Sequence, residues 1–96
     1  MTVFDARRTD DGRVLLSGRF HATHAELVRT LLEGVENSAV VDFSGLSYIS
    51  SAGLGVLLGA QKRLAQSGHG LHLVNLNAHI RELFRLAGFD HVFEID

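Results

Sequence analysis

Residues 40–64 read VVDFSGLSYISSAGLGVLLGAQKRL, and the hydrophobic period changes in the middle of this stretch. Residues 39–43 form a short apolar run rich in β-branched side chains, which predicts a buried strand. From about Ser51 onward, apolar side chains recur at helical spacing with polar residues around them, which predicts an amphipathic helix. We therefore expect a strand that leads directly into a helix, and we place the function at the junction between the two.

The N-terminal part of the chain predicts a β-hairpin. Two strand-like runs, residues 2–7 and 14–17, flank the sequence Thr9-Asp10-Asp11-Gly12. This is a turn signal, because glycine tolerates positive φ and aspartate can bond its own backbone. Gly18 is expected to end the second strand, and residues 19–22 are expected to form a connecting loop.

A first helix is expected after that loop. Thr23 and Glu26 have the spacing of a capping box, in which the threonine oxygen accepts a backbone N–H and the glutamate reaches back. The helix is expected to end near residues 36–37. Its apolar stripe is predicted to consist of Leu27, Val28, Leu31, Leu32 and Val35.

The C-terminal part predicts a strand, a short helix and a last strand. Gly68 is a plausible left-handed cap for the central helix, and residues 71–76 have the pattern of a strand. Asn77 can cap a short helix that Gly88 stops, and residues 91–95 form the last strand. The core face of that short helix is predicted to consist of Ile80, Leu83, Phe84 and Ala87.

The predicted order of elements is β-β-α-β-α-β-α-β, in a single domain over residues 1–96. The opening hairpin is antiparallel. The later strands alternate with helices, so they should pair in parallel through right-handed crossovers. We therefore expect an α/β domain with a mixed β-sheet covered by helices.

Composition narrows the classes of function. The chain has 96 residues and a net charge of −2, with its nine basic residues scattered, which argues against a nucleic-acid partner. The absence of cysteine excludes disulfides and thiol chemistry. The longest apolar run, near residues 56–60, is too short to span a bilayer, and no leader sequence is recognisable, so we expect a cytoplasmic protein without membrane insertion.

Motifs for catalysis and for cofactors are incomplete. Ser51 follows a strand and opens a helix, as a hydrolase nucleophile does, but Ile49 stands where that elbow requires glycine. The glycines within residues 53–59 fit neither the dinucleotide fingerprint nor the P-loop. The six histidines are dispersed and lack the spacing of a metal site. The sequence therefore predicts no enzyme, no catalytic residue, no metal and no cofactor.

Ser50 and Ser51 stand at the predicted helix start, which carries free N–H groups and a partial positive charge. A hydroxyl there can cap the helix or, if phosphorylated, hold a phosphate in a favourable field. Gly55 and Gly59 share one face of the helix and leave a shallow groove beside Ser51. Its neighbour is either the chain's own sheet or another protein, and a small ligand such as a nucleotide is a third possibility.

Residues 42–55, DFSGLSYISSAGLG, resemble the signature of the STAS domain, which occurs in bacterial anti-sigma factor antagonists and in sulfate transporters. Residues 16–20, LSGRF, look like the turn before the first helix in that family. Residues 80–89, IRELFRLAGF, look like its third helix and the turn into its last strand. The resemblance covers nearly the whole chain and implies the STAS fold.

In the antagonist branch of this family, the serine after the Asp of an Asp-Ser-Ser/Thr-Gly motif is phosphorylated by a partner kinase, often the anti-sigma factor itself. Matched residue by residue, that serine is Ser51, with Ser50 as the alternative acceptor. The resemblance implies an anti-sigma factor antagonist (anti-anti-sigma factor) that binds an anti-sigma factor/serine-protein kinase when unphosphorylated and is reset by a PP2C-type phosphatase. It is expected to be a monomer or a weak dimer. The implied partner-binding residues are Ser50, Ser51, Ala52, Gly53, Gly55, His21 and Thr23.

Three positions depart from the family pattern. Ser50 replaces the Asp before the acceptor, Ala52 replaces the following Ser/Thr, and His21 replaces an Asp often found after the second strand. The loss of an acid beside Ser51 removes a negative charge that a kinase could recognise. The alternative function is therefore a constitutive STAS scaffold in a transporter or signalling complex, without phosphorylation.

Overall fold

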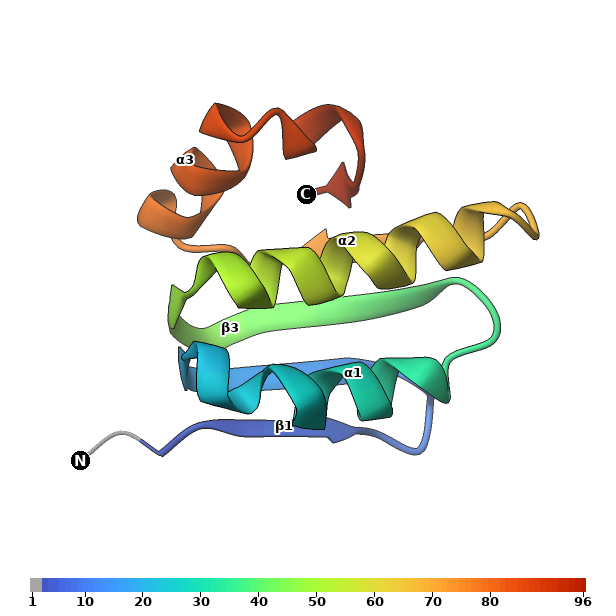
Figure 1. The fold of residues 1–96 in the computed structure, drawn as a ribbon, viewed down its shortest axis with the longest axis horizontal. Helices are drawn as coiled ribbons and strands as arrows, with labels where there is room; N and C mark the ends of the chain where they lie inside the picture. The colour runs from blue at the N-terminus through green and yellow to red at the C-terminus, as the bar shows by residue number, and fades with distance from the viewer. Residues whose placement is uncertain (1–2) are drawn as a thin grey trace.

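A computed structural model describes residues 3–96 as a five-stranded mixed sheet with helices packed against it (Figure 1). The strands lie in the sheet in their order along the chain; β1 and β2 are antiparallel, and every later neighbouring pair is parallel. This confirms the predicted order of strands and helices. The elements are β1 Asp5–Arg8, β2 Val14–Phe20, the 3₁₀ helix η1 Ala22–His24, α1 Ala25–Glu33, β3 Ala39–Ile49, α2 Ser51–Ala65, β4 Leu71–Val74, α3 Ala78–Leu86, the 3₁₀ helix η2 Phe89–His91 and β5 Glu94–Ile95.

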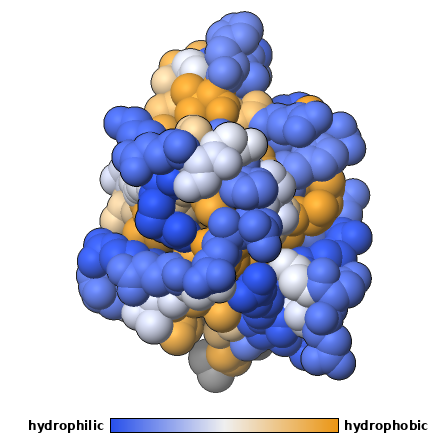
Figure 2. All heavy atoms as spheres, turned by 90° about the vertical axis from the view of Figure 1, so that its right-hand side faces the viewer, coloured by the Kyte–Doolittle hydropathy of each residue, from blue (hydrophilic) through white to orange (hydrophobic). Residues whose placement is uncertain are grey.

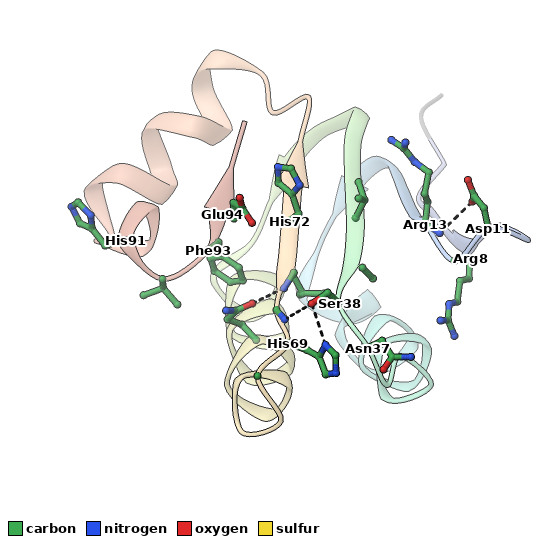
Figure 3. A pocket seen from close by; sticks show the side chains of 18 residues that line it. Arg8, Asp11, Arg13, Asn37, Ser38, His69, His72, His91, Phe93 and Glu94 are labelled. Atoms are coloured by element: carbon green, nitrogen blue, oxygen red, sulfur yellow. Dashed lines mark hydrogen bonds between the residues drawn. The ribbon is translucent and has the colours of Figure 1, made fainter.

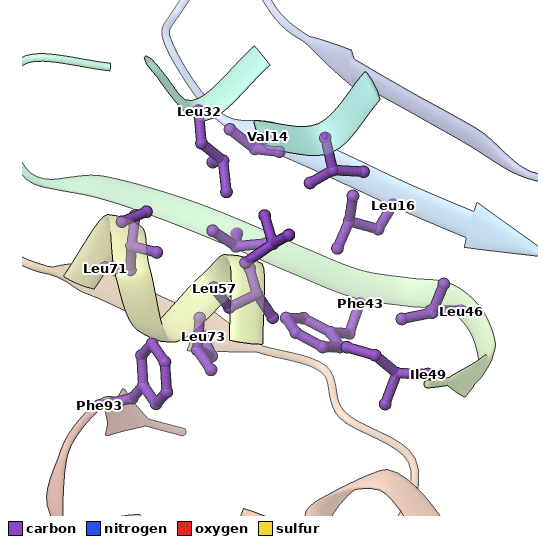
Figure 4. Close-up of a cluster of buried hydrophobic side chains, with 14 of the residues drawn as sticks. Val14, Leu16, Leu32, Phe43, Leu46, Ile49, Leu57, Leu71, Leu73 and Phe93 are labelled. Atoms are coloured by element: carbon purple, nitrogen blue, oxygen red, sulfur yellow. The ribbon is translucent and has the colours of Figure 1, made fainter. Parts of the chain in front are cut away.

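The hydrophobic core lies between the sheet and the helices. Apolar side chains at alternate positions of β2, β3 and β4 are buried, because successive residues of a strand point to opposite faces of a sheet. Leu57 of α2 is fully buried and lies among side chains of the central strands, including Phe43 and Leu73 (Figure 4). Burial of each such side chain contributes about 1.5–3 kcal/mol, so this layer fixes how α2 lies on β3.

Both central strands are longer than predicted. The strand expected over residues 39–43 continues to Ile49, and β2 passes Gly18 and ends at Phe20. Gly18 has φ +87° and lies at a shift in the β2–β3 register, so it marks a β-bulge and not a strand end. The extension carries β2 and β3 together to the start of α2.

The start of the first helix differs from the prediction. Thr23 lies inside η1 and cannot be the N-cap, so the predicted capping box with Glu26 is wrong. His21 is the N-cap of η1, and its backbone N–H donates to Nδ1 of His24 at 3.1 Å; His24 is in turn the N-cap of α1. Helix α1 ends at Glu33, short of residues 36–37.

The predicted apolar stripe of the first helix is confirmed at four positions and wrong at one. Val28, Leu32 and Val35 are buried and Leu31 is half-buried against the core, whereas Leu27 is 57% exposed. Leu27 precedes Val28 in the first turn of α1, where the helix surface turns from the sheet to solvent.

The helix stops of the C-terminal half are confirmed. Gly68 and Gly88 both have positive φ, 77° and 78°, beyond the ends of α2 and α3. Asn77 caps α3, since its side chain accepts the backbone N–H of Ile80 at 2.8 Å. Ile80 and Phe84 are buried on the core face of α3, but Ala87 is exposed because it is the C-cap of that helix.

The last two strands are shorter than predicted. β4 ends at Val74, because Asn75 adopts a left-handed conformation with φ 62°. The strand predicted over residues 91–95 is reduced to Glu94–Ile95, and η2 precedes it. Thr2, which the first predicted strand included, lies outside the described residues.

Candidate functional site

The candidate site lies at the end of the molecule where β2 and β3 finish and where α1 and α2 begin, at the left of Figure 1. The backbone N–H of Ser50 donates to the carbonyl oxygen of Phe20 at 2.9 Å, which ties the start of α2 to the end of β2. The loop between β2 and η1 therefore lies directly beside the two serines.

The two serines have different surroundings. Ser50 is the N-cap of α2 and is half-buried, and its Oγ accepts the backbone N–H of Gly53 at 3.1 Å. Ser51 is the first residue of the helix, is exposed, and its hydroxyl makes no hydrogen bond within residues 3–96. The capping role thus belongs to Ser50, and the hydroxyl of Ser51 remains open to solvent.

The electrostatics of this helix start suit an anion. The first N–H groups of a helix lack intrahelical partners, and the helix dipole adds a partial positive charge there. The 15-residue helix α2 has no acidic residue in its first turn. A phosphate on Ser51 would therefore meet a favourable field and would leave the cap at Ser50 intact.

His21 and Thr23 are both exposed beside this helix start. The ring of His21 lies 5.2 Å from the ring of Tyr48 and 5.9 Å from that of His24. Thr23 lies in η1, which contacts α2. The structure thus brings the predicted residues of the loop after β2 to the same end as Ser51.

Gly53 is buried, and its small size is required by the chain's own packing. A Cβ there would lie 2.9 Å from Cγ1 of Ile49 and 3.1 Å from Cδ2 of Phe20. Ala52 beside it is half-buried. Gly53 therefore faces the core of the domain and does not face outward.

Gly55 and Gly59 are exposed, and a Cβ at either position would meet nothing within 4 Å. They line a groove of about 450 Å³ between α1 and α2. Leu32 and Val56 contribute apolar surface to it, and charged residues of both signs also line it: Arg29, Glu33 and Arg63. The sequence left open whether the chain's own sheet or another protein lies against these glycines. Within residues 3–96 the sheet does not contact them, and the groove faces outward.

Arg19 and Tyr48 were not singled out from the sequence. They are paired across β2 and β3, and the guanidinium carbon of Arg19 lies 4.7 Å from the centre of the Tyr48 ring. Arg19 lies two residues before His21, near the end of β2, and Tyr48 lies three residues before Ser51, near the end of β3. A register between the two strands would have revealed the pair, but register is not visible in one sequence.

A larger hollow of about 920 Å³ lies at the opposite end of the molecule, which Figure 2 shows as a face with many hydrophilic side chains. Several of its polar groups bind one another or nearby loop backbone. Ser38 Oγ accepts the N–H of Gly70 at 3.0 Å, and Arg8 donates to the carbonyl oxygen of Gly34. In Figure 3 the labelled side chains stand around the rim, with Arg8 and His91 on opposite sides, and they do not converge on one point. This end is best explained as loop structure.

Asp42 lies within β3. Burial raises the pKa of its carboxyl, but hydrogen bonds from Asn75 and Ser44 and the charge of Arg13 more than offset this and hold the pKa below its usual value. The Arg13 guanidinium lies 3.2 Å from the carboxylate. The group is engaged on the sheet and is not free for acid–base chemistry.

Within residues 3–96, no three His, Asp or Glu side chains stand close enough together to hold a metal ion. No helix in the same residues is both long and apolar enough to cross a bilayer.

Comparison with known proteins places the chain in a family. Residues 3–94 match the family model described as "Mlab, STAS domain". The chain is 39% identical over 82 residues to a protein of Bordetella bronchiseptica with the provisional name anti-sigma factor antagonist BtrV, covering 85% of this chain and 70% of the relative. It is 34% identical over 93 residues to the anti-sigma-B factor antagonist of Listeria monocytogenes, covering 93% of this chain and 82% of the relative.

The fold is similar to that of a solved antagonist structure. The chain superposes on the Bacillus cell fate determinant SpoIIAA in its phosphorylated form with a TM-score of 0.71 and 20% identity, covering 98% of this chain and 91% of SpoIIAA. At this identity the likeness shows the fold alone.

Proposed function

Because the chain belongs to the STAS-domain family of anti-sigma factor antagonists, we propose that it is a cytoplasmic partner-switching regulator controlled by phosphorylation of Ser51. The unphosphorylated form binds an anti-sigma factor that is also a serine-protein kinase. Phosphorylation releases that partner, and a PP2C-type phosphatase restores the binding form. The proposal rests mainly on the exposed hydroxyl of Ser51 at the first position of α2, next to a different serine that carries the cap.

Ser51 fits the role of acceptor better than Ser50. A kinase must bring the hydroxyl to the γ-phosphate of its nucleotide, which requires an oxygen that is exposed and not already bound. The hydroxyl of Ser50 holds the N–H of Gly53, so its modification would remove the cap of α2. Phosphorylation of Ser51 leaves that cap in place, and the switch therefore works without refolding the domain.

The energetics suit a release switch. A phosphate brings about −1.5 to −2 charges and three acceptor oxygens. If it costs the docked interface about 2.7 kcal/mol through repulsion and desolvation, the affinity falls about a hundredfold. In this proposal the chain is the kinase's substrate and supplies no catalytic group of its own.

The test is phosphorylation in vitro. The protein is incubated with the cognate kinase and ATP, and the peptide that covers residues 50 and 51 is analysed by mass spectrometry. We expect one phosphate on Ser51, none on Ser51→Ala, and unchanged modification of Ser51 in Ser50→Ala. An unmodified peptide in the wild-type protein contradicts the proposal.

A paired measurement separates switching from folding. Ser51→Asp is expected to weaken binding to the kinase while the circular dichroism spectrum stays nearly unchanged. Collapse of the spectrum would show that Ser51 is mainly structural.

The second candidate is a constitutive STAS scaffold without phosphorylation. It is favoured by the serine at position 50, where the family pattern has an aspartate. Neighbouring genes discriminate the two. A histidine-kinase-like ATPase or a PP2C-type phosphatase supports the switch, and an ABC transporter operon supports the scaffold.

A further inference from the structure

Most of the basic side chains are already engaged, and the two exceptions lie far apart. Arg19 and Lys62 are the only Lys or Arg residues whose charged group has no hydrogen bond or ion pair within residues 3–96. Arg19 is at the Ser51 end of the molecule, and Lys62 lies toward the far end of α2. The engaged residues are Arg7, Arg8, Arg13, Arg29, Arg63, Arg81 and Arg85.

The guanidinium of Arg19 is held in place although it has no ion pair. It stacks on Tyr48 at 4.7 Å, and the cross-strand pairing of Arg19 with Tyr48 fixes the two residues side by side. Tyr48 is half-buried and supports the exposed arginine. A guanidinium has five N–H donors in a planar fork that matches a carboxylate. Stacking reduces the entropy that arginine would otherwise lose on binding, so these donors are presented ready for an acceptor.

The surroundings of Arg19 lack negative charge. The segments that build this end of the molecule, residues 19–24, 46–54 and 75–80, contain no Asp or Glu, although the whole chain has a net charge of −2. Asp5, which pairs with Ser17 across β1 and β2, and Glu26 in the first turn of α1 are each paired with an arginine. The ring of His21 lies beside that of Tyr48 and adds a further polar group to this surface. We define Arg19, His21, Tyr48 and Ser51 as the Arg19 surface.

We propose that the Arg19 surface docks an acidic segment of the partner protein and that Arg19 receives one of its carboxylates. This inference rests on the proposed function, because the partner is the protein that phosphorylation of Ser51 releases. It adds the chemistry of that partner and the residue that selects it.

The direction of the switch supports an acidic partner. A phosphate beside a basic partner surface forms new charge-assisted hydrogen bonds and strengthens the complex. A phosphate beside an acidic segment repels it and competes for the donors of Arg19. Release on phosphorylation therefore requires a partner surface that is not basic, and an arginine with free donors favours one that is acidic.

The first experiment needs no natural partner. The ¹⁵N-labelled protein is titrated at low salt with hexaglutamate and, separately, with hexalysine. Since the chain is net negative, general electrostatic attraction favours hexalysine. We expect hexaglutamate to shift the amide signals of residues 19–24 and 47–52, and hexalysine to leave them in place. Absence of shifts with hexaglutamate, or shifts of these residues with hexalysine, overturns the inference.

Lys62 provides the matched control. Arg19→Gln is expected to abolish the shifts caused by hexaglutamate, and Lys62→Gln, which removes the other unpaired cation, is expected to keep them. The ¹⁵N spectrum of each variant shows directly that it is folded. Equal loss in both variants would mean that net charge alone drives the binding, which contradicts a specific role for Arg19.

The second experiment uses the kinase that phosphorylates Ser51. Calorimetry is expected to show an affinity about tenfold or more lower for Arg19→Gln and within twofold of wild type for Lys62→Gln. If the wild-type protein neither binds the kinase nor is phosphorylated, the proposed function fails. If it binds and switches but Arg19→Gln binds equally well, only the present inference fails.

Discussion

At the scale of single residues, the two adjacent serines differ in chemistry because their backbone conformations differ. Ser50 has extended φ and ψ of −80° and 165°, which turns its hydroxyl onto the N–H of Gly53, whereas Ser51 has entered the helix and points outward. A modification enzyme can reach the second hydroxyl without disturbing the first. This separation of cap and acceptor is the structural basis of the proposed switch.

Stability measurements can test the separation. Ser50→Ala is expected to lower the free energy of unfolding by about 1 kcal/mol, because the N-cap bond is lost. Ser51→Ala, its matched control, is expected to change it by less than about 0.5 kcal/mol. Urea unfolding followed by circular dichroism measures both. Equal effects would mean that the two hydroxyls share the cap.

The hydrogen bonds of the Asp42 carboxylate, together with its ion pair, predict a pH dependence. The folded state holds the pKa of Asp42 below its usual value, so the carboxylate stabilises the fold above the pKa of the unfolded chain, about 4, and this contribution is lost as pH falls through the lower folded value. Asp42→Asn is expected to reduce stability by about 1–2 kcal/mol near neutral pH. The difference from wild type should shrink as pH falls below about 4.

Urea unfolding at a series of pH values measures that difference. Asp10→Asn is the control, because Asp10 is exposed and has no ion pair within residues 3–96. A difference between wild type and Asp42→Asn that stays constant down to about pH 3 would contradict a depressed pKa.

At the scale of elements, α2 has two kinds of glycine. Gly53 faces the core and cannot take a Cβ without moving Ile49 or Phe20, which are themselves buried. Gly55 and Gly59 face the open groove. Each glycine weakens a helix by about 1 kcal/mol relative to alanine, so the exposed pair lowers stability without any benefit to the packing of the chain.

Alanine substitutions at the two kinds of glycine should therefore change the free energy of unfolding in opposite directions. Gly55→Ala and Gly59→Ala are each expected to raise the free energy of unfolding by about 0.5–1 kcal/mol. Gly53→Ala is expected to lower it by about 1–3 kcal/mol, because a methyl group overpacks the core. Thermal and urea unfolding compare the three variants, and stabilisation by Gly53→Ala would contradict the packing described here.

At the scale of the whole molecule, the C-terminal elements are attached through aromatic packing. The fully buried ring of Phe84 lies 6.0 Å from Phe43 on β3 and 5.7 Å from Phe93 before β5, in edge-to-face geometry. Phe84 thus joins α3 and the last strand to the central sheet.

Phe84→Ala is expected to lower the free energy of unfolding by about 3–5 kcal/mol. Hydrogen exchange should show the largest loss of protection in residues 78–95. Leu86→Ala on the same helix removes a side chain that is 69% exposed and should change stability by less than about 0.5 kcal/mol. A uniform loss of protection across the sheet would mean that the C-terminal elements do not unfold as a separate unit.

The two ends of the molecule also differ in how their polar groups are used. At the end with the larger hollow, arginine and serine side chains bind the loops that they come from or their neighbours. At the Ser51 end, the guanidinium of Arg19 and the hydroxyl of Ser51 have no such partner within residues 3–96. An unpaired guanidinium and an unpaired hydroxyl at the same end suit a protein that docks through that end.

The sequence by itself determined the features that depend on short range. The order of elements, the start of α2 at Ser51, the cap at Asn77 and the stops at Gly68 and Gly88 follow from hydrophobic period and from hydrogen bonds that span a few residues. Their physical cause is local, so one chain segment contains all the information.

Only the tertiary structure decided which side chains remain free. The register between β2 and β3 places Arg19 opposite Tyr48, and pairing between the two strands continues beyond the predicted strand ends. The packing of α2 on the sheet buries Gly53 and leaves Gly55 and Ser51 exposed. These outcomes depend on segments tens of residues apart in the chain. A local sequence pattern cannot predict them, because burial and strand pairing depend on contacts with segments that are distant in the sequence.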